Sequence, residues 1–144
     1  LIGWKTVKDA SNYHKINFQL KQDASRFEEG SQNLIGVHAL RASIRLLLSI
    51  GIEKIEQWNL HLTDLLLKGL KGRGCRILSS TLPQDRSSII SFTTDNKAKD
   101  KALVNYLIKN KIIVSLRADG IRLSPHLYNT SAEIAKFFRV FDMS

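Results

Sequence analysis

From residue 34 onward, hydrophobic residues recur at intervals of three and four, which is the spacing of one face of an α-helix. In the segment 34–50 these positions are Val37, Leu40, Ile44, Leu47 and Leu48. In the segment 52–72 they are Ile52, Ile55, Leu62, Leu65, Leu66 and Leu70. The glycine between the two segments can end the first helix. The pattern therefore predicts two consecutive helices with a very short connection.

The spacing then changes to short runs rich in Ile, Ser, Thr and Phe, which are typical of strands. Four such runs are present, at 75–79, 88–93, 112–116 and 121–124. The last two are separated by Ala118-Asp119-Gly120, a sequence suited to a tight turn. We therefore expect the last two strands to form a hairpin.

Two further helices complete the pattern. The segment 97–110 can be capped by Asp95 or Asn96, and its inward-facing residues are Leu103, Tyr106 and Leu107. Near the end of the chain, Thr130 and Glu133 have the spacing of a capping box, and the helix that follows carries Ile134, Phe137, Phe138 and Phe141. The order helix-helix-strand-strand-helix-strand-strand-helix predicts an α+β fold, with a small antiparallel sheet covered by helices on one face.

The first 33 residues differ from the rest. They mix polar residues with Trp4, Tyr13, Phe18 and Phe27, and show neither the helical nor the strand spacing over any length. The chain also starts on leucine. Such a segment has little to bury itself with, so we expect 1–33 to be an arm of a larger protein and 34–144 to form a separate domain.

The composition sets limits on the class of protein. With 144 residues, 43% hydrophobic and 24% charged, the chain has the size and character of one globular domain. A single cysteine excludes a disulfide scaffold and a cysteine-rich zinc site. No apolar run approaches the ~20 residues of a membrane span, and no signal-peptide pattern is present. We expect a soluble, cytoplasmic protein.

The formal net charge of +9 permits nucleic-acid binding. The densest basic run, Lys68, Lys71, Arg73 and Arg76, falls at the end of a predicted helix, where cations offset the helix dipole. No aromatic residue alternates with this run to stack on bases, and no known nucleic-acid-binding motif is present. A basic nucleic-acid-binding module remains an alternative, but we do not expect a nucleic-acid partner.

Two stretches carry residues suited to binding an anion. Arg122 stands between Ile121 and Leu123 in a predicted strand, so it faces away from the core if those two face into it. A guanidinium fixed on a strand is a planar donor for a carboxylate or phosphate, and a surface salt bridge is the alternative interpretation. Gly30-Ser31 precedes a helix, where backbone N–H groups and a hydroxyl can hold an anion.

The remaining reactive residues form no active site on their own. Cys75 has no histidine or acid near it in the sequence, and a buried cysteine is the simpler interpretation. His14, His38 and His61 lack the spacing of metal ligands, so no metal site is expected. His126 follows a proline at a strand end, which suits a structural role.

The two stretches together resemble a known family. Residues 26–33 read Arg-Phe-Glu-Glu-Gly-Ser-Gln-Asn, followed by Ala42-Ser43 within a helix and by Ile-Gly-Ile-Glu at 50–53. Residues 115–117 read Ser-Leu-Arg, and 121–130 read Ile-Arg-Leu-Ser-Pro-His-Leu-Tyr-Asn-Thr. This order, with the opening Gly3-Trp4, resembles the class V aminotransferases, which are pyridoxal-phosphate enzymes of fold type I that include cysteine desulfurases and isopenicillin-N-epimerase-like proteins.

The resemblance implies a role for each matching residue. Residues 1–33 would be the tail of the large cofactor domain, and 34–144 the C-terminal small domain. Gly30 and Ser31 would bind the phosphate of pyridoxal 5'-phosphate across a homodimer. Arg122 would hold the carboxylate of an amino-acid substrate, with Arg117 as a further substrate-binding arginine. His126 would support the fold around Arg122.

The departures from the family pattern matter as much. In the family, the lysine that forms the Schiff base lies before the Gly-Trp pair. In this chain Lys15 comes after Gly3-Trp4, so it does not match that lysine. The segment therefore has no catalytic residue of this kind and is not expected to be active alone. Desulfurases carry a cysteine between the two hairpin arginines, where this chain has only Ala118-Asp119-Gly120. Transamination, epimerisation or lyase chemistry is therefore favoured, and a non-catalytic fragment or pseudoenzyme is the alternative.

Overall fold

The computed structural model describes residues 3–117 and 119–144; Ala118, the first residue of the predicted tight turn, and residues 1–2 lie outside this description. The chain forms two compact units, Leu1–Leu47 and Leu48–Ser144. Their border lies inside helix α1 (Leu34–Ile50), whereas the predicted domain border lies at the start of that helix. The division into compact units does not test the predicted border between a large-domain tail and a small domain, which stays a prediction.

The first unit is held together mainly by backbone hydrogen bonds. It contains two short 3-10 helices, η1 (Trp4–Thr6) and η2 (Ala24–Phe27). Between them the Lys8 N–H donates to the Gln19 carbonyl at 2.7 Å, and the Lys21 N–H donates to the Thr6 carbonyl at 3.1 Å. Thr6 is the one buried residue among those described in this unit. The segment therefore has no hydrophobic core of its own, as its lack of periodicity indicated.

Helix α1 has the predicted bounds, and its start is set by Asn33. The Asn33 Oδ1 accepts a hydrogen bond from the Gly36 N–H at 2.9 Å, which satisfies one of the free donors at a helix N-terminus. The hydrophobic face of α1 is largely uncovered, since Val37 is 58% and Leu40 61% exposed. The helical pattern is confirmed, and most of its apolar face is exposed in the part of the chain that the structure describes.

The second unit contains the predicted order of helices and strands. Its elements after α1 are α2 (Ile52–Lys71), β1 (Arg76–Ile77), β2 (Ile90–Thr93), α3 (Lys97–Lys109), β3 (Ser115–Arg117), β4 (Gly120–Leu123) and α4 (Ser131–Phe141). The strands form one antiparallel sheet in the order β1-β2-β4-β3. Of the described helices, none alone is long and apolar enough to span a bilayer, and only α1 and α2 taken together across Gly51 satisfy that test.

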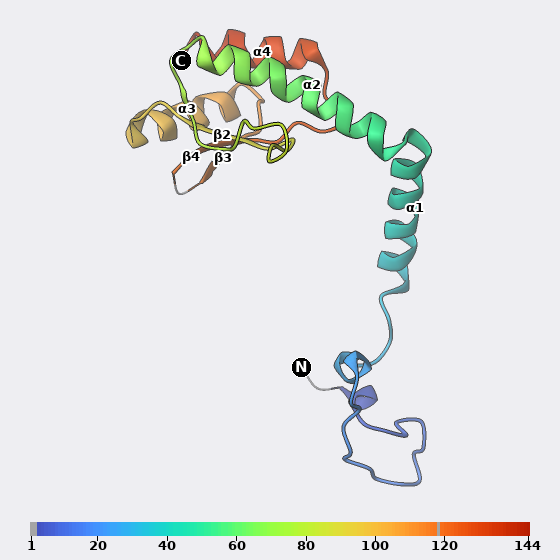
Figure 1. Ribbon diagram of the computed structural model, residues 1–144. Coiled ribbons are helices and arrows are strands. Elements are labelled where there is room, and N and C mark those ends of the chain that lie inside the picture. Colours follow the sequence, from blue (N-terminus) through green and yellow to red (C-terminus); the bar gives the residue numbers. More distant parts are fainter. Residues whose placement is uncertain (1–2, 118) are drawn as a thin grey trace. The chain divides into compact units, whose positions relative to one another are not determined.

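The core lies between one face of the sheet and helices α2, α3 and α4. Figure 1 shows α2 and α4 running side by side along the sheet. The two central strands contribute Ile90, Phe92, Ile121 and Leu123, all of which are nearly or fully buried. The helices contribute Leu62, Leu66, Leu70, Leu103, Val104, Leu107, Ile134 and Phe137. The α+β prediction, with helices on one face of an antiparallel sheet, is confirmed.

Three of the four strands are shorter than predicted, whereas β4 keeps its predicted length and is shifted by one residue. The predicted strand 112–116 is observed as Ser115–Arg117. Its first residues are used otherwise, because the Ile112 N–H donates to the Leu107 carbonyl at 2.9 Å and closes the last turn of α3. Near β1, both Leu78 and Ser79 donate to the Ser91 carbonyl, which ends the regular pairing there. Short strands here follow from competition for backbone hydrogen bonds.

Side-chain caps fix the starts of the last two helices. Asn96 caps α3, since its Oδ1 accepts hydrogen bonds from the Ala98 and Lys99 N–H groups at 3.0 and 3.1 Å. Thr130 and Glu133 form the predicted capping box of α4, in which the Thr130 N–H donates to the Glu133 carboxylate at 2.8 Å. Asn96 is one of the two caps predicted for α3, and the capping box of α4 is formed by the two predicted residues.

A buried carboxylate joins β2 to α3. Asp100 is 2% exposed and accepts hydrogen bonds from the Thr93 hydroxyl at 2.6 Å, the Thr94 N–H at 2.9 Å and the Thr94 hydroxyl at 2.8 Å. Burial acts to raise the pKa of Asp100, but these hydrogen bonds outweigh it and the net pKa lies below the ordinary value. The ionised side chain therefore stabilises the fold.

We expect Asp100→Asn to destabilise the chain by about 1–3 kcal/mol at pH 7, because hydrogen bonds to the charged carboxylate are lost in a buried site. Because the folded pKa is lowered, the contribution of Asp100 is present above the unfolded pKa and is lost as the pH falls through the folded pKa. The difference between the two proteins should therefore shrink below about pH 4. Urea unfolding followed by tryptophan fluorescence at pH 7 and pH 3 measures the free energy of unfolding of both proteins.

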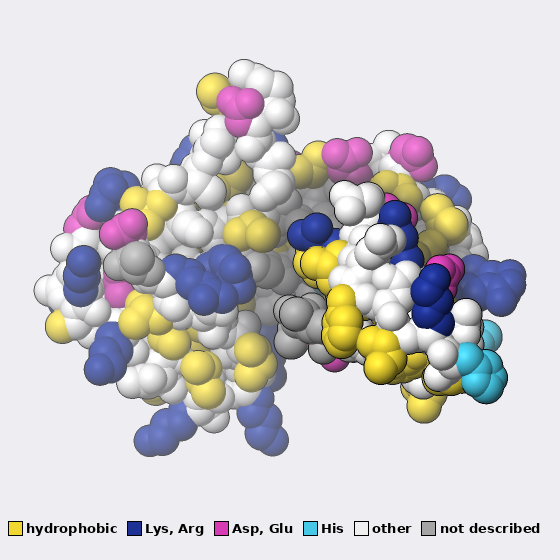
Figure 2. All heavy atoms as spheres, turned by 90° about the horizontal axis from the view of Figure 1, so that it is seen from below, with side chains coloured by type: hydrophobic (Ala, Val, Ile, Leu, Met, Phe, Trp, Pro, Cys, Tyr) yellow, Lys and Arg dark blue, Asp and Glu magenta, His cyan; other side chains and the backbone are white. Residues whose placement is uncertain are grey.

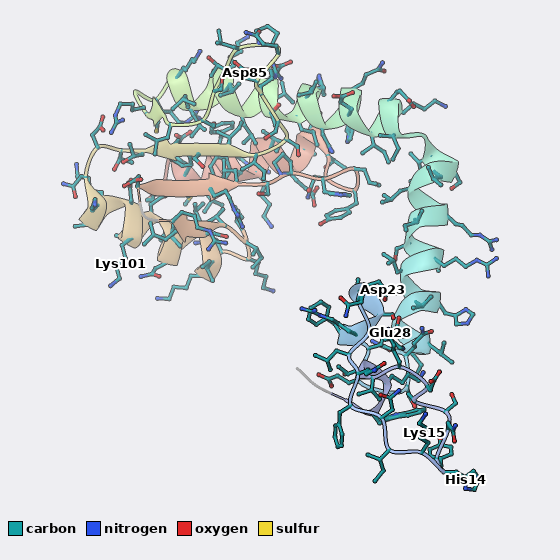
Figure 3. All side chains as sticks on the ribbon, turned by 60° about the horizontal axis from the view of Figure 1, so that its bottom comes forward. His14, Lys15, Asp23, Glu28, Asp85 and Lys101 are labelled. Atoms are coloured by element: carbon teal, nitrogen blue, oxygen red, sulfur yellow. The ribbon has the colours of Figure 1, made fainter. Side chains whose placement is uncertain are left out.

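The control is Asp85→Asn, which removes an exposed carboxylate in the loop beside α2 (Figure 3). It should change stability by less than about 0.5 kcal/mol. Equal effects of the two substitutions would contradict the role given to Asp100.

Candidate functional site

The outward face of the sheet carries both arginines of the hairpin. Ser91, Arg122 and Ser115 lie opposite one another in the strand register and so share this face. Arg117 pairs with Gly120, two residues from Arg122 along β4, and therefore belongs to the same face. Diagonal neighbours of this kind are about 7–8 Å apart. The hairpin thus brings the two predicted substrate-binding residues together.

Arg122 is fixed by the core residues on either side of it. Ile121 is fully buried and Leu123 is 6% exposed, so the alternation along β4 turns Arg122 to the other face. Its Nε is buried and has no hydrogen-bond partner within residues 3–117 and 119–144. The ion pairs in that part of the chain involve other arginines. The alternative interpretation of Arg122, a surface salt bridge, thus finds no partner there.

A pocket of about 530 Å³ lies at the end of β4. Its walls come from the segment between α3 and β3, from the loop after β4, and from α4. The polar and charged lining residues include Lys111, Ser115, Arg122, Asn129, Glu133 and Lys136, and the apolar ones include Leu66, Ile112, Val114, Leu123, Ile134 and Phe137. The volume is in the range of a small-molecule site, and Arg122 forms part of its wall.

The loop after β4 is braced by Asn129, a residue that the sequence analysis did not single out. The Asn129 Oδ1 accepts from the His126 N–H at 2.9 Å, and its carbonyl accepts from the indole N–H of Trp58 on α2 at 3.0 Å. His126 itself is exposed and stacks on Tyr128, with ring centroids 5.0 Å apart. The one signal in the sequence was the position of Asn129 directly before a capping box.

Gly30 and Ser31 lie in the first unit, between η2 and α1. Ser31 is exposed, and its hydroxyl makes no hydrogen bond with the residues that the structure describes. A Cβ on Gly30 would lie 3.0 Å from the indole nitrogen of Trp4, so a larger residue would crowd the ring. The loop therefore presents a free hydroxyl on a backbone that approaches Trp4 closely.

Two further candidates belong to the first unit. His14 and Lys15 lie in the exposed loop of the first unit, between Lys8 and Gln19 (Figure 3). Within the described part of the chain, no three His, Cys, Asp or Glu side chains form a group that could hold a metal ion.

The basic run after α2 is partly neutralised. Arg73 forms a two-pronged ion pair with Asp142 and lies over the Phe138 ring at 4.3 Å, and Arg76 pairs with Asp95 at 2.6 Å. Lys and Arg side chains are spread among hydrophobic and uncharged ones on the face seen in Figure 2. Both arginines of the run thus have structural partners.

Cys75 is a poor nucleophile in this fold. It lies directly before β1 and is 9% exposed. Burial raises the pKa of its thiol, and the negative charge of Asp100 adds to this effect, while Arg73 opposes it. The prediction of a buried cysteine is confirmed.

Comparisons with known proteins agree on one family. The sequence pattern of the family described as "Aminotransferase class-V" matches residues 1–137. An uncharacterized aminotransferase of Schizosaccharomyces pombe is 34% identical over 128 residues, which cover 89% of this chain and 32% of that protein. A probable cysteine desulfurase of Pyrococcus abyssi is 26% identical over 155 residues, covering 99% of this chain and 38% of that protein.

Solved structures share the fold. A cysteine desulfurase from Thermococcus onnurineus NA1 superposes with a TM-score of 0.84 at 23% identity, over 99% of this chain and 38% of that one. The complex of a cystine C–S lyase with cysteine persulfide gives a TM-score of 0.75 at 24% identity, over 98% of this chain and 37% of that one. The chain thus spans about a third of the length of the proteins it matches.

Because the Cys75 thiol is buried and its pKa is raised, we expect iodoacetamide to modify the folded chain at least about tenfold more slowly than it modifies free cysteine at pH 7. Mass spectrometry over time measures the rate, and the same chain in urea is the control that should react at the free rate. Rapid modification of the folded chain would mean that Cys75 is an available nucleophile.

Proposed function

This chain belongs to the class-V aminotransferase family, and from that premise we propose that it supplies the substrate-carboxylate site of a pyridoxal-phosphate-dependent enzyme acting on an amino acid. The residue that binds the carboxylate is Arg122. The observation that carries the proposal is the buried Nε of Arg122, which has no partner among the described residues on a pocket of ligand size.

A buried donor without a partner is unfavourable, since it has lost its hydrogen bonds to water. A carboxylate would relieve this, because it accepts two parallel hydrogen bonds from one guanidinium. The flanking core residues hold the strand, so the guanidinium is positioned before the substrate arrives. Binding then fixes the orientation of the amino acid and not only its presence, which is a large part of catalysis in such sites.

Arg117 adds a second positive charge on the same face of the hairpin. Arg117 is exposed and is absent from the ion pairs of the described residues. We assign it to attracting the substrate anion toward Arg122, since neighbouring charges of one sign raise the local concentration of counter-ions.

The cofactor site is only partly provided by this chain. Ser31 fits a phosphate contact, because its hydroxyl is exposed and is not engaged by the described residues. In a homodimer it would donate a hydrogen bond to the phosphate held by the partner, while the large domain would hold the rest of the group. When bound, pyridoxal phosphate supplies an electron sink for the carbanion formed at the amino-acid substrate.

The reaction type follows from the position of the only cysteine. Cys75 is buried directly before β1, whereas the hairpin between Arg117 and Arg122 contains no thiol. A persulfide-forming nucleophile is thus missing from the substrate face, although cysteine desulfurases are among the similar proteins. Transamination, epimerisation or lyase chemistry is the proposed class.

We expect Arg122→Lys, in the enzyme that joins this chain to its large domain, to lower kcat/KM for the amino acid by about 100-fold or more. An ammonium keeps the charge but cannot form the planar two-pronged pair, and misplaced substrates lose rate on this scale. Steady-state kinetics measures the change. Arg139→Lys, at an exposed arginine of α4, is the control and should leave the rate unchanged. If Arg122→Lys and Arg139→Lys had the same kcat/KM, the assignment of Arg122 to carboxylate binding would be wrong.

We expect Ser31→Ala to weaken cofactor retention by about tenfold, the loss of roughly one hydrogen bond to a charged group. Dialysis followed by absorbance of the bound cofactor measures retention. Ser11→Ala, in the exposed loop of the same unit, is the control. The same retention in both variants would show that Ser31 does not contact the phosphate.

A further inference from the structure

Lys111 has a backbone conformation that favours glycine. Its φ is +60°, in the left-handed region that side chains disfavour. It stands directly after α3, where its N–H donates to the Ile108 carbonyl at 2.9 Å and the next N–H, of Ile112, donates to the Leu107 carbonyl at 2.9 Å. Glycine is the usual residue at this position of a helix end. A lysine in this conformation is a reason to ask what its side chain contributes.

Lys111 is one of the residues that line the same pocket as Arg122. Two other charged residues line it, Glu133 and Lys136. Glu133 is engaged in the capping box, and its pKa is lowered first by the Thr130 N–H, with the Lys136 charge contributing. Lys136 thus has an acidic neighbour in the pocket wall. Lys111, Arg122 and Lys136 all form no ion pair with the described residues.

Part of the pocket wall is apolar. It includes Ile112 and Val114 before β3, Leu123 on β4, and Ile134 and Phe137 on α4. Such a surface suits a short hydrocarbon segment with an acidic group at each end, because the methylene groups meet apolar side chains and the two anions meet Lys111 and Arg122.

We propose that the amino acid bound at this site carries a second acidic group, as a dicarboxylic amino acid does, and that Lys111 binds that group. This rests on the proposed function, in which Arg122 holds the α-carboxylate. Lys111 then determines specificity: its ammonium discriminates in favour of substrates with a distal carboxylate over those with an alkyl side chain.

The test compares glutarate with butyrate, two ligands of similar length that differ in the second carboxylate. The ¹⁵N-labelled chain is titrated with each at constant ionic strength, and the Nε–H signal of Arg122 reports binding. We expect both ligands to shift this signal and glutarate to bind at least about tenfold more tightly, as one added charged contact predicts. Lys111→Gln should remove the advantage of glutarate and leave the butyrate affinity unchanged.

Two further variants separate the proposal from its alternatives. Lys109→Gln, at an exposed lysine of α3 outside the pocket, removes the same charge and should keep the glutarate advantage, which excludes general attraction to a basic chain. Lys111→Gly relieves the backbone conformation, so its melting temperature should equal or exceed that of the unaltered chain while the glutarate advantage is lost. A merely structural lysine would change stability without changing this preference.

The outcomes are distinct. If glutarate binds no more tightly than butyrate, or keeps its advantage in both Lys111 variants, the specificity role is wrong while Arg122 keeps its carboxylate role. If neither ligand shifts the Arg122 signal, the proposed function fails and the specificity role fails with it.

Discussion

The alternation of side chains along β4 is the constraint on which the site depends. Ile121 and Leu123 are buried against the helices. Because successive side chains of a strand point to opposite faces of the sheet, Arg122 lies on the opposite face. Because β4 is a central strand, paired on one side with β2 and on the other with β3, neither its register nor its direction can shift without moving the core. The same packing that stabilises the fold thus positions the guanidinium, and the strand needs no separate support for it.

The elements around β4 extend this constraint to the pocket. Gly120 allows the start of β4 to lie close against β2, since a Cβ there would meet the Phe92 carbonyl oxygen. Asn129 ties the loop after β4 to α2 through Trp58, and the Thr130–Glu133 capping box starts α4 directly behind that loop. The pocket is therefore bounded by backbone that is hydrogen-bonded on several sides, which is what a site that discriminates between similar ligands requires.

Much of this arrangement could be predicted from the sequence, because it follows from local rules. The bounds of α1, the capping box of α4 and the outward direction of Arg122 all come from spacing within a few residues. The rest depends on contacts between distant residues. The segment 112–114 has the composition of a strand, yet the Ile112 N–H is used by α3. The left-handed Lys111 and the bracing role of Asn129 carry no periodic signal, so the sequence alone could not connect either of them with Arg122.

Arg122 and Ser31, which are proposed to bind the substrate and the cofactor phosphate, differ in what positions them. Arg122 belongs to a unit with a continuous core of its own, so the placement of its guanidinium is a property of this chain. Ser31 belongs to a unit whose one buried described residue is Thr6, and Tyr13 and Phe18 there are 82% and 84% exposed. Backbone hydrogen bonds shape that loop, but they supply little of the hydrophobic free energy that would hold it rigid. The proposed carboxylate site is therefore positioned by the core of the second unit, whereas the proposed phosphate contact of Ser31 has no such core behind it.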